Sequence, residues 1–192
     1  RVTSTEYDHE DNALVSAYTA NALNQYERRT VPGYAGVRGT ATNTATVTVN
    51  GNPAWRLDEY FYGGDEADNS LAAIMKQLAI TAVYNPPGTN TPDMVASQTG
   101  RVFVAQTPEA FTYDDDGNLT QDGRFTYIWD AENRLVGVTT RNDLPPEVPR
   151  VKVAYLYDHQ SRRIASVTAV WINDIWQATE SRAFLYDGWN VV

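Results

Sequence analysis

The chain has 192 residues, of which 42% are hydrophobic and 11% aromatic, so general intrinsic disorder is excluded. Its net charge of -9 argues against nucleic acid and anionic membranes as partners, because an anionic surface repels phosphate. The absence of Cys excludes disulfide bonds and thiolate metal sites.

Residues 1–39 contain a Tyr-Asp pair, Tyr7-Asp8, that recurs later in the chain at Tyr113, Tyr157 and Tyr186. A repeated dipeptide is a reason to look for a repeat architecture before anything else. We therefore treat residues 1–39 as an N-terminal repeat segment and residues 108–192 as a longer one.

The repeat is absent between residues 40 and 107. Short strand-like segments with turn signals between them predict a small inserted β-sandwich there. The predicted strands are 44–50, 56–62, 78–84 and 101–105, with turns at Asn50-Gly51, Gly63-Gly64 and 85–88. Leu71, Ile74, Met75 and Leu78 have helical spacing, which leaves one or two helical turns as an alternative; β-branched Thr81 and Val83 favour a strand from about Met75.

Between residues 108 and 192 three units share the same offsets. An aromatic residue and Asp come first, Gly, Asn or Ser follows three residues after the Asp, and an aliphatic residue comes soon after. Asp accepts hydrogen bonds from turn amides, and Gly or Asn adopts positive φ, so each unit predicts a strand, a tight turn and a returning strand. The units are Tyr113–Leu119, Trp129–Leu135 and Tyr157–Ile164.

The segments around these units alternate with period two, as strands do, at 111–113, 125–129 and 151–157. Asp122-Gly123 is a hairpin turn signal. Residues 143–149 contain three prolines and predict a loop, because proline breaks a strand ladder.

These units resemble the YD-repeat (Rhs-type) family of bacteria, with the match carried by residues 111–136, 157–164 and 184–190 and, near the start, 18–26. The resemblance implies an antiparallel hairpin sheet that spirals into a hollow shell, which often encloses a C-terminal toxin domain. It also implies secretion or display at the cell surface, with the rest of the parent shell and a toxin domain as partners. The Asp-Pro-x-Gly segment at which the family cleaves itself is absent from this sequence.

The fold class expected is mostly β, an antiparallel repeat sheet with an inserted sandwich, and the function expected is a non-catalytic structural segment of a shell or surface protein. No catalytic, cofactor-binding or metal-binding residue is predicted. His9 and His159 are explained by their repeat position, and Asp114–Asp116 fails the spacing of an EF-hand. The repeat-defining residues are Tyr7, Asp8, Tyr113, Asp114, Gly117, Asn118, Trp129, Asp130, Arg134, Tyr157, Asp158, Arg162, Tyr186 and Asp187.

The alternative function is a carbohydrate- or protein-binding module in the insertion. Trp55, Tyr60 and Tyr62 are its predicted surface, because three consecutive aromatics at 60–62 cannot all face one core. The chain starts without Met and ends without a polar tail, so we expect a section of a longer protein with no membrane span. Open sheet edges in such a section predict self-association.

Overall fold

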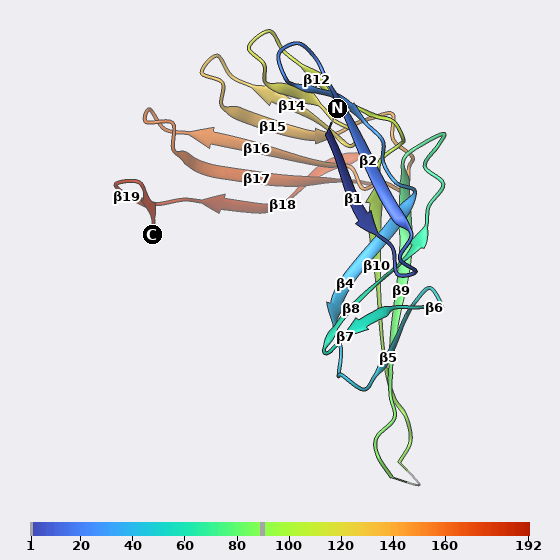
Figure 1. Ribbon diagram of the computed structural model, residues 1–192. Coiled ribbons are helices and arrows are strands. Elements are labelled where there is room, and N and C mark those ends of the chain that lie inside the picture. Colours follow the sequence, from blue (N-terminus) through green and yellow to red (C-terminus); the bar gives the residue numbers. More distant parts are fainter. Residues whose placement is uncertain (1, 89–90) are drawn as a thin grey trace. The chain divides into compact units, whose positions relative to one another are not determined.

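The computed structural model describes residues 2–88 and 91–192 and divides into two compact units, each described by itself (Figure 1). Unit 1 contains the chain up to Ala20 together with Arg28–Glu109, and unit 2 contains Asn21–Glu27 and Ala110–Val192. The strands pair in antiparallel fashion, and no helix occurs in the described residues, so the predicted mostly β fold is confirmed. Accordingly, no helix in that part of the chain could span a membrane.

Two sheets form a sandwich in unit 1. One has the order β10-β9-β5-β6 and the other the order β4-β8-β7. Ala35, Val49, Leu78 and Val104, contributed by both sheets, are buried between them, and this core excludes water from both inner faces. The strands are β4 (Tyr34–Thr40), β5 (Thr46–Val49), β6 (Asn52–Pro53), β7 (Trp55–Leu57), β8 (Tyr60–Glu66), β9 (Ile74–Tyr84) and β10 (Met94–Val104).

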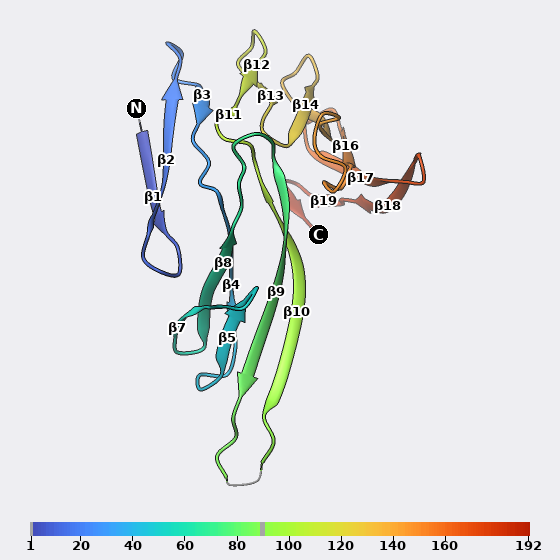
Figure 2. The ribbon, with the colours of Figure 1, turned by 90° about the vertical axis from the view of Figure 1, so that its right-hand side faces the viewer.

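The long strands β9 and β10 lie side by side along their whole lengths (Figure 2). Beside the sandwich, β1 (Val2–Tyr7) and β2 (Ala13–Ala20) form a hairpin. The chain passes between the two units in the short strands β3 (Tyr26–Arg29) and β11 (Glu109–Ala110). Strand β4 begins within the segment 1–39, so part of that predicted repeat segment belongs to the sandwich.

Two expectations for the insertion need correction. The predicted strand 56–62 is a hairpin, because Asp58 adopts φ 49° and turns the chain between β7 and β8. Gly63 and Gly64 do not end a strand but lie inside β8. The helical alternative at residues 71–78 is also wrong: β9 begins at Ile74, and Leu78 is buried in the core of the sandwich.

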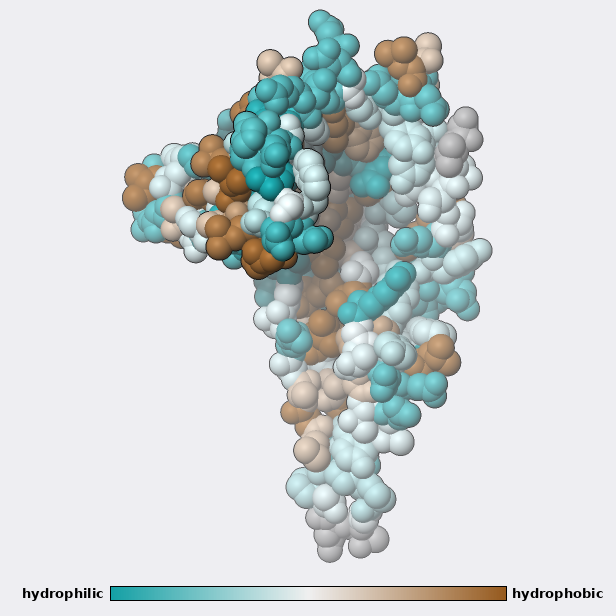
Figure 3. All heavy atoms as spheres, turned by 90° about the vertical axis from the view of Figure 1, so that its left-hand side faces the viewer, coloured by the Kyte–Doolittle hydropathy of each residue, from teal (hydrophilic) through white to brown (hydrophobic). Residues whose placement is uncertain are grey.

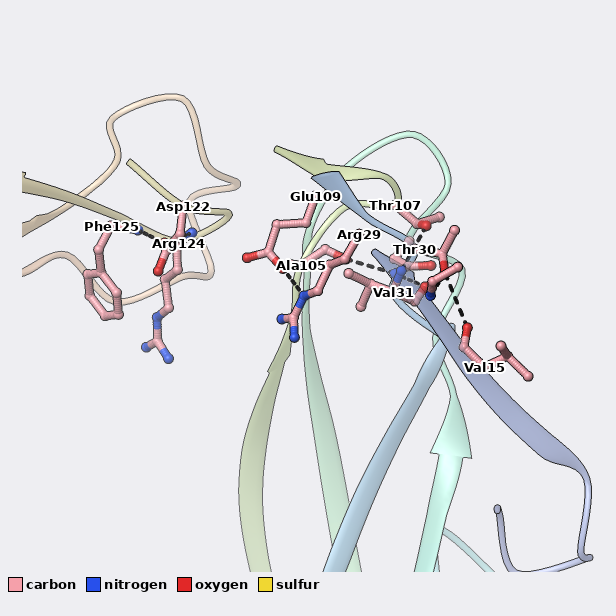
Figure 4. A network of polar contacts seen from close by, with 12 residues as sticks. Val15, Arg29, Thr30, Val31, Ala105, Thr107, Glu109, Asp122, Arg124 and Phe125 are labelled. Carbon is pink, nitrogen blue, oxygen red and sulfur yellow. Dashed lines mark hydrogen bonds and ion pairs between the residues drawn. The ribbon is translucent and has the colours of Figure 1, made fainter. Parts of the chain in front are cut away.

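Polar contacts tie together the end of unit 1 that lies near Thr107 (Figure 4). The Thr107 hydroxyl accepts a hydrogen bond from the Val31 amide (3.0 Å), and the Thr30 hydroxyl donates to the Val15 carbonyl (3.2 Å). Arg29 forms an ion pair with Glu109, whose side chain is buried. Strands distant in sequence are thereby fixed to one another.

Unit 2 is a seven-stranded meander in which each strand pairs with the next strand in the chain. Turn signals at Asp122-Gly123 and the loop at 143–149 connect strands as expected from the sequence. The strands are β12 (Thr112–Tyr113), β13 (Leu119–Gln121), β14 (Phe125–Trp129), β15 (Leu135–Thr140), β16 (Val151–Tyr157), β17 (Arg163–Ile172) and β18 (Ile175–Ala183), followed by a separate hairpin of β19 (Tyr186–Asp187) and β20 (Asn190–Val191).

Candidate functional sites: a row of turns and an aromatic groove

The turn between β14 and β15 shows what the Tyr-Asp units build. Asp130 Oδ1 accepts hydrogen bonds from the amides of Glu132 (2.9 Å) and Arg134 (3.0 Å). The Asp130 amide donates to the Arg134 carbonyl and the Asn133 amide to the Asp130 carbonyl, each at 3.0 Å. Asn133 adopts φ 58°, a conformation that Asn tolerates. One carboxylate therefore satisfies the amides of a five-residue turn.

The same turn occurs five times in the residues that the structure describes. In each copy the first residue accepts from the amides two and four positions later, and the fourth residue has positive φ. Asn21 replaces Asp in one copy, and its Oδ1 accepts from Leu23 and Gln25. The copies are Asp8–Asn12, Asn21–Gln25, Asp114–Asn118, Asp130–Arg134 and Asp158–Arg162.

The turn at Asn21–Gln25 is absent from our sequence-based prediction. Its signal was readable, since Asn24 stands at the positive-φ position, three residues after a side-chain acceptor. The Tyr186-Asp187 unit was predicted as a repeat, but its turn is not of this five-residue type. Asp187 pairs with Asn190 around a two-residue turn in which Gly188 has φ 61°. It ends the series with a tighter hairpin.

In unit 2 the last residue of each turn reaches forward to the next turn. The Asn118 side chain donates to Asn133 Oδ1 (2.8 Å), and Arg134 Nη1 lies 3.4 Å from the Ser161 hydroxyl. Arg162 Nη1 donates to the Gly188 carbonyl (2.6 Å). Gln25 similarly contacts the Gly117 carbonyl (3.4 Å). We call this series the turn row: 21–25, 114–118, 130–134, 158–162 and 187–190.

The aromatic residue of each unit bonds in the opposite direction, to the carbonyl that follows the preceding turn. The Trp129 indole donates to Leu119, the Tyr157 hydroxyl to Leu135 and the Tyr186 hydroxyl to Arg163, each at 2.8 Å. The Arg134 and Arg162 guanidinium groups also lie over the rings of Tyr157 (5.2 Å) and Tyr186 (5.0 Å). Tyr113 is hydrogen-bonded to the backbone of Tyr26. Successive Tyr-Asp repeats are therefore linked by such contacts, which run both to the repeat before and to the repeat after.

The turn carboxylates are held in their charged form. Burial by itself raises the pKa of Asp114, Asp130 and Asp158, but the hydrogen bonds within each turn outweigh it and lower that pKa below its ordinary value. Asp130 and Asp158 also pair with Arg134 (2.8 Å) and Arg162 (2.7 Å). Among the described residues, no group of three or more His, Asp or Glu has the geometry to hold a metal ion.

The predicted surface residues of the insertion lie on the outer face of the β4-β8-β7 sheet. Trp55 of β7 pairs with Tyr62 of β8, which pairs with Arg38 of β4. Tyr60 lies two residues from Tyr62 and faces the same way, whereas Phe61 between them is buried against the sandwich core. Trp55, Tyr60 and Tyr62 are thus brought together, with Arg38 in the same row.

Two glycines allow tyrosine rings to lie flat on this face. Gly36 and Gly64 are directly opposite each other in β4 and β8. A Cβ atom at Gly36 would lie 3.1 Å from the Tyr62 ring, and one at Gly64 would lie 2.6 Å from the Tyr34 ring. Each tyrosine therefore covers the glycine of the neighbouring strand, an arrangement that protects exposed backbone in sheets. The ring centroids of Tyr34 and Tyr62 are 6.4 Å apart.

The β1–β2 turn forms one wall of a groove over this face. His9 Nδ1 is hydrogen-bonded to the Tyr34 hydroxyl (3.1 Å), and the two rings stack. Burial, followed by the nearby Tyr62, raises the pKa of Tyr34 to about 12, so Tyr34 is neutral at physiological pH. The groove has a volume of about 540 Å³ and is lined by Tyr7, Asp8, Asp11, Arg38, Gly39, Thr40, Trp55, Tyr60, Phe61 and Tyr62.

Sequence reasoning missed the part of the groove supplied by residues 1–39. Tyr7 and Asp8 were predicted as repeat-defining residues, and Arg38 was not singled out. A shared face between these residues and Trp55 depends on how β1, β4 and β7 are arranged in space. The pattern Tyr34-x-Gly36 and Tyr62-x-Gly64 was a readable signal of paired tyrosine–glycine contacts.

No family model matches the sequence. A stretch of 79 residues is 34% identical to the tRNA nuclease WapA of Bacillus subtilis strain 168. The same identity and length relate it to the tRNA(Glu)-specific nuclease WapA of B. subtilis subsp. natto and the tRNA3(Ser)-specific nuclease WapA of Bacillus spizizenii. The chain is similar to a part of these nucleases. The matched stretch covers 41% of this chain and spans 3% of the length of each relative.

The names of these three similar proteins correct the expectation about enzymatic activity. The sequence predicted a protein without enzymatic activity, and that prediction is contradicted because all three similar proteins are named nucleases. That prediction rested on a search for catalytic residues within these 192 residues. Such a search cannot detect an activity of a much longer protein.

Proposed function

We propose that this chain is a framework section of a YD-repeat (Rhs-type) protein whose activity is of the kind for which its relatives are named, tRNA cleavage. The observation that supports the proposal most directly is the turn row. Its four five-residue turns have matched hydrogen bonds, and side chains of the row contact the neighbouring hairpins in a fixed order. The partial similarity to the WapA nucleases adds the functional context.

In this proposal the turn row keeps a curved sheet rigid, so that the sheet can hold the nuclease part of a secreted or surface protein. The physical reason is that the forward and backward contacts join successive hairpins at the ends of the strands where the turns lie. Loss of one unit's contacts therefore loosens its neighbours as well. The partners proposed are the adjoining repeats and the nuclease domain of the parent protein.

The test uses the parent protein with Asp130→Ala and Asp158→Ala combined. Both substitutions remove the acceptor that organises a turn. We expect faster limited proteolysis within the sheet and tRNA cleavage that becomes sensitive to protease treatment. Asp115→Ala is the matched control, because it removes the same charge from a turn without touching its hydrogen bonds.

Unchanged protease resistance and unchanged protection of the nuclease in the double variant would overturn the framework proposal. So would tRNA cleavage by this chain alone that is lost on Asp130→Ala, since the turn would then belong to a reaction centre.

A further inference from the structure

The groove on the outer face of the β4-β8-β7 sheet has features that the turn row does not explain. It lies entirely in unit 1 and combines exposed rings with charged groups at its wall. Trp55 is 50% exposed, and Tyr7 and Tyr60 are each 57% exposed. Exposing three large rings on one surface costs free energy that burial elsewhere would recover, and such patches mark interaction sites.

The Tyr62 ring, and the Tyr34 ring beside it, are held in place before any ligand arrives. Trp55 and Tyr62 are direct neighbours across the β7–β8 pair, and the Tyr62 ring lies over Gly36. The Arg38 guanidinium lies 5.1 Å from the centroid of the Tyr62 ring. Tyr34 is fixed from the other side by His9. A ring fixed in this way loses little side-chain entropy on binding.

We propose that this groove binds a short, neutral oligosaccharide. Aromatic rings pack against the apolar faces of sugar rings, and the carboxylates of Asp8 and Asp11 accept hydrogen bonds from sugar hydroxyls. Arg38 donates to sugar oxygens from β4, on the sheet face beside Tyr62. The volume of about 540 Å³ is within the range of small-ligand sites, about 300–1,000 Å³. This site is independent of the framework function proposed above.

The charges lining the groove favour an uncharged sugar. Two carboxylates, Asp8 and Asp11, face one guanidinium, that of Arg38, so an acidic sugar would meet net repulsion. The same carboxylates disfavour a proline-rich peptide, the other usual occupant of an aromatic groove. Such a peptide offers mainly carbonyl acceptors, which cannot pair with carboxylates, whereas sugar hydroxyls donate as well as accept.

Figure 3 shows that the apolar side chains on the face that it displays lie in several patches interleaved with polar ones.

A second hollow is a rival candidate for the same ligand. A smaller hollow of about 370 Å³ in unit 2 is also lined by aromatic residues, among them Tyr157, Tyr186 and Trp189. Trp189 is 74% exposed and serves as the matched control for Trp55.

The experiment screens the chain of residues 1–192 on an array of neutral hexose and N-acetylhexosamine oligosaccharides, with acidic oligosaccharides alongside. The strongest neutral glycan is then titrated by calorimetry against the wild type, Trp55→Ala, Tyr60→Ala and Trp189→Ala. We expect Trp55→Ala and Tyr60→Ala each to weaken binding at least about tenfold, and Trp189→Ala to leave it unchanged. Circular dichroism and thermal unfolding check that each variant is folded.

A milder variant keeps the test valid if Trp55→Ala does not fold. Asp11 lies in an exposed turn, so Asp11→Asn is expected to weaken the binding of the same glycan without loss of structure. Several results would overturn the proposal: no neutral glycan bound, a preference for acidic glycans, displacement by a proline-rich peptide, or loss of binding in Trp189→Ala but not in Trp55→Ala.

Discussion

The Tyr157 hydroxyl donates a hydrogen bond to the Leu135 carbonyl, 22 residues earlier and 2.8 Å away. This single contact joins the last residue of β16 to the first residue of β15, next to the turns of two successive hairpins. It is repeated by Tyr186 with Arg163 and, through an indole, by Trp129 with Leu119. Because a backbone carbonyl is the acceptor, the contact depends on the aromatic donor and not on the side chain that it meets.

Tyr157→Phe should lower the free energy of unfolding by about 1 kcal/mol, because it leaves the Leu135 carbonyl without this donor. Urea denaturation of the purified chain measures the change. Tyr155→Phe is the control on the same strand, since no hydrogen bond of its hydroxyl occurs in the described part of the chain. Equal effects of the two substitutions would mean that the contact with Leu135 contributes nothing.

Ser161 occupies the positive-φ position of its turn, with φ 61°. A β-branched residue is strained there, so Ser161→Val should destabilise the chain by about 1–2 kcal/mol. Ser161→Gly should raise its stability by up to about 1 kcal/mol, since Gly adopts this conformation freely. Ser181→Val, at an exposed position of β18, should be tolerated because Val suits a strand. Thermal melts of the three variants would contradict the assigned turn if Ser161→Val and Ser181→Val behaved alike.

The turn carboxylates predict loss of stability in acid. Their pKa is lowered in the folded chain, as it is for Asp114, Asp130 and Asp158, so their contribution is complete above the unfolded value of 3.8. It is lost as pH falls below that value through the folded pKa. Urea midpoints measured from pH 7 down to strongly acidic pH should show this decline.

A triple variant, Asp114→Asn with Asp130→Asn and Asp158→Asn, supplies the control for the acid dependence. Asn21 shows that an amide oxygen can accept the same turn hydrogen bonds without a charge. The variant should therefore fold but have a flatter dependence of stability on pH. An unchanged slope would assign the acid sensitivity to other groups, such as Asp65, whose pKa is lowered by Lys76 and Asn50.

Gly64→Ala should destabilise unit 1 by about 1–3 kcal/mol, because the added methyl group would lie 2.4 Å from the Ala35 carbonyl oxygen and 2.6 Å from the Tyr34 ring. Gly100→Ala is the matched control: its Cβ would meet no atom within 4 Å, and Gly100 is likewise in a strand. Differential scanning calorimetry compares the two. A neutral Gly64→Ala would show that neither the Ala35 carbonyl nor the Tyr34 ring needs to lie so close to the backbone at this point.

Arg29→Met should cost about 3 kcal/mol or more, because it removes an ion-pair partner from Glu109, which is 6% exposed. The double variant Arg29→Met with Glu109→Leu should recover much of that loss, since the buried charge disappears as well. Chemical denaturation of the two single variants and the double variant gives the coupling. Additive effects would mean that the two side chains do not depend on each other.

The sequence was most informative where one local interaction decides the structure. Asn50 and Gly51 adopt φ 49° and 86° in the predicted turn, and Asp122-Gly123 connects β13 to β14. Period-two alternation identified strands such as 151–157, where it reflects the two sides of one sheet. The Asp58 turn was missed because no Gly or Pro marks it, and a run of strand-forming residues follows.

The groove was predictable only in part. Alternation placed Tyr60 and Tyr62 on one face, away from Phe61, because side chains in a strand point to opposite sides. The position of Arg38 beside Tyr62 follows from the β4–β8 register, and that of Tyr7 from the placement of a hairpin more than thirty residues earlier. Neither relationship is contained in a local pattern.

The turn row has a consequence for how such chains can change in length. The hairpins around residues 130–134 and 158–162 each carry a donor toward the hairpin before them and a side chain that reaches the one after them. The Asp residues of successive turns, at 114, 130 and 158, are 16 and 28 residues apart. The connections at the other ends of the strands therefore vary in length, while the turn stays constant. Duplication or deletion of the gene segment for one hairpin therefore leaves the same contacts at the new junction, and the sheet can be lengthened without compensating substitutions elsewhere.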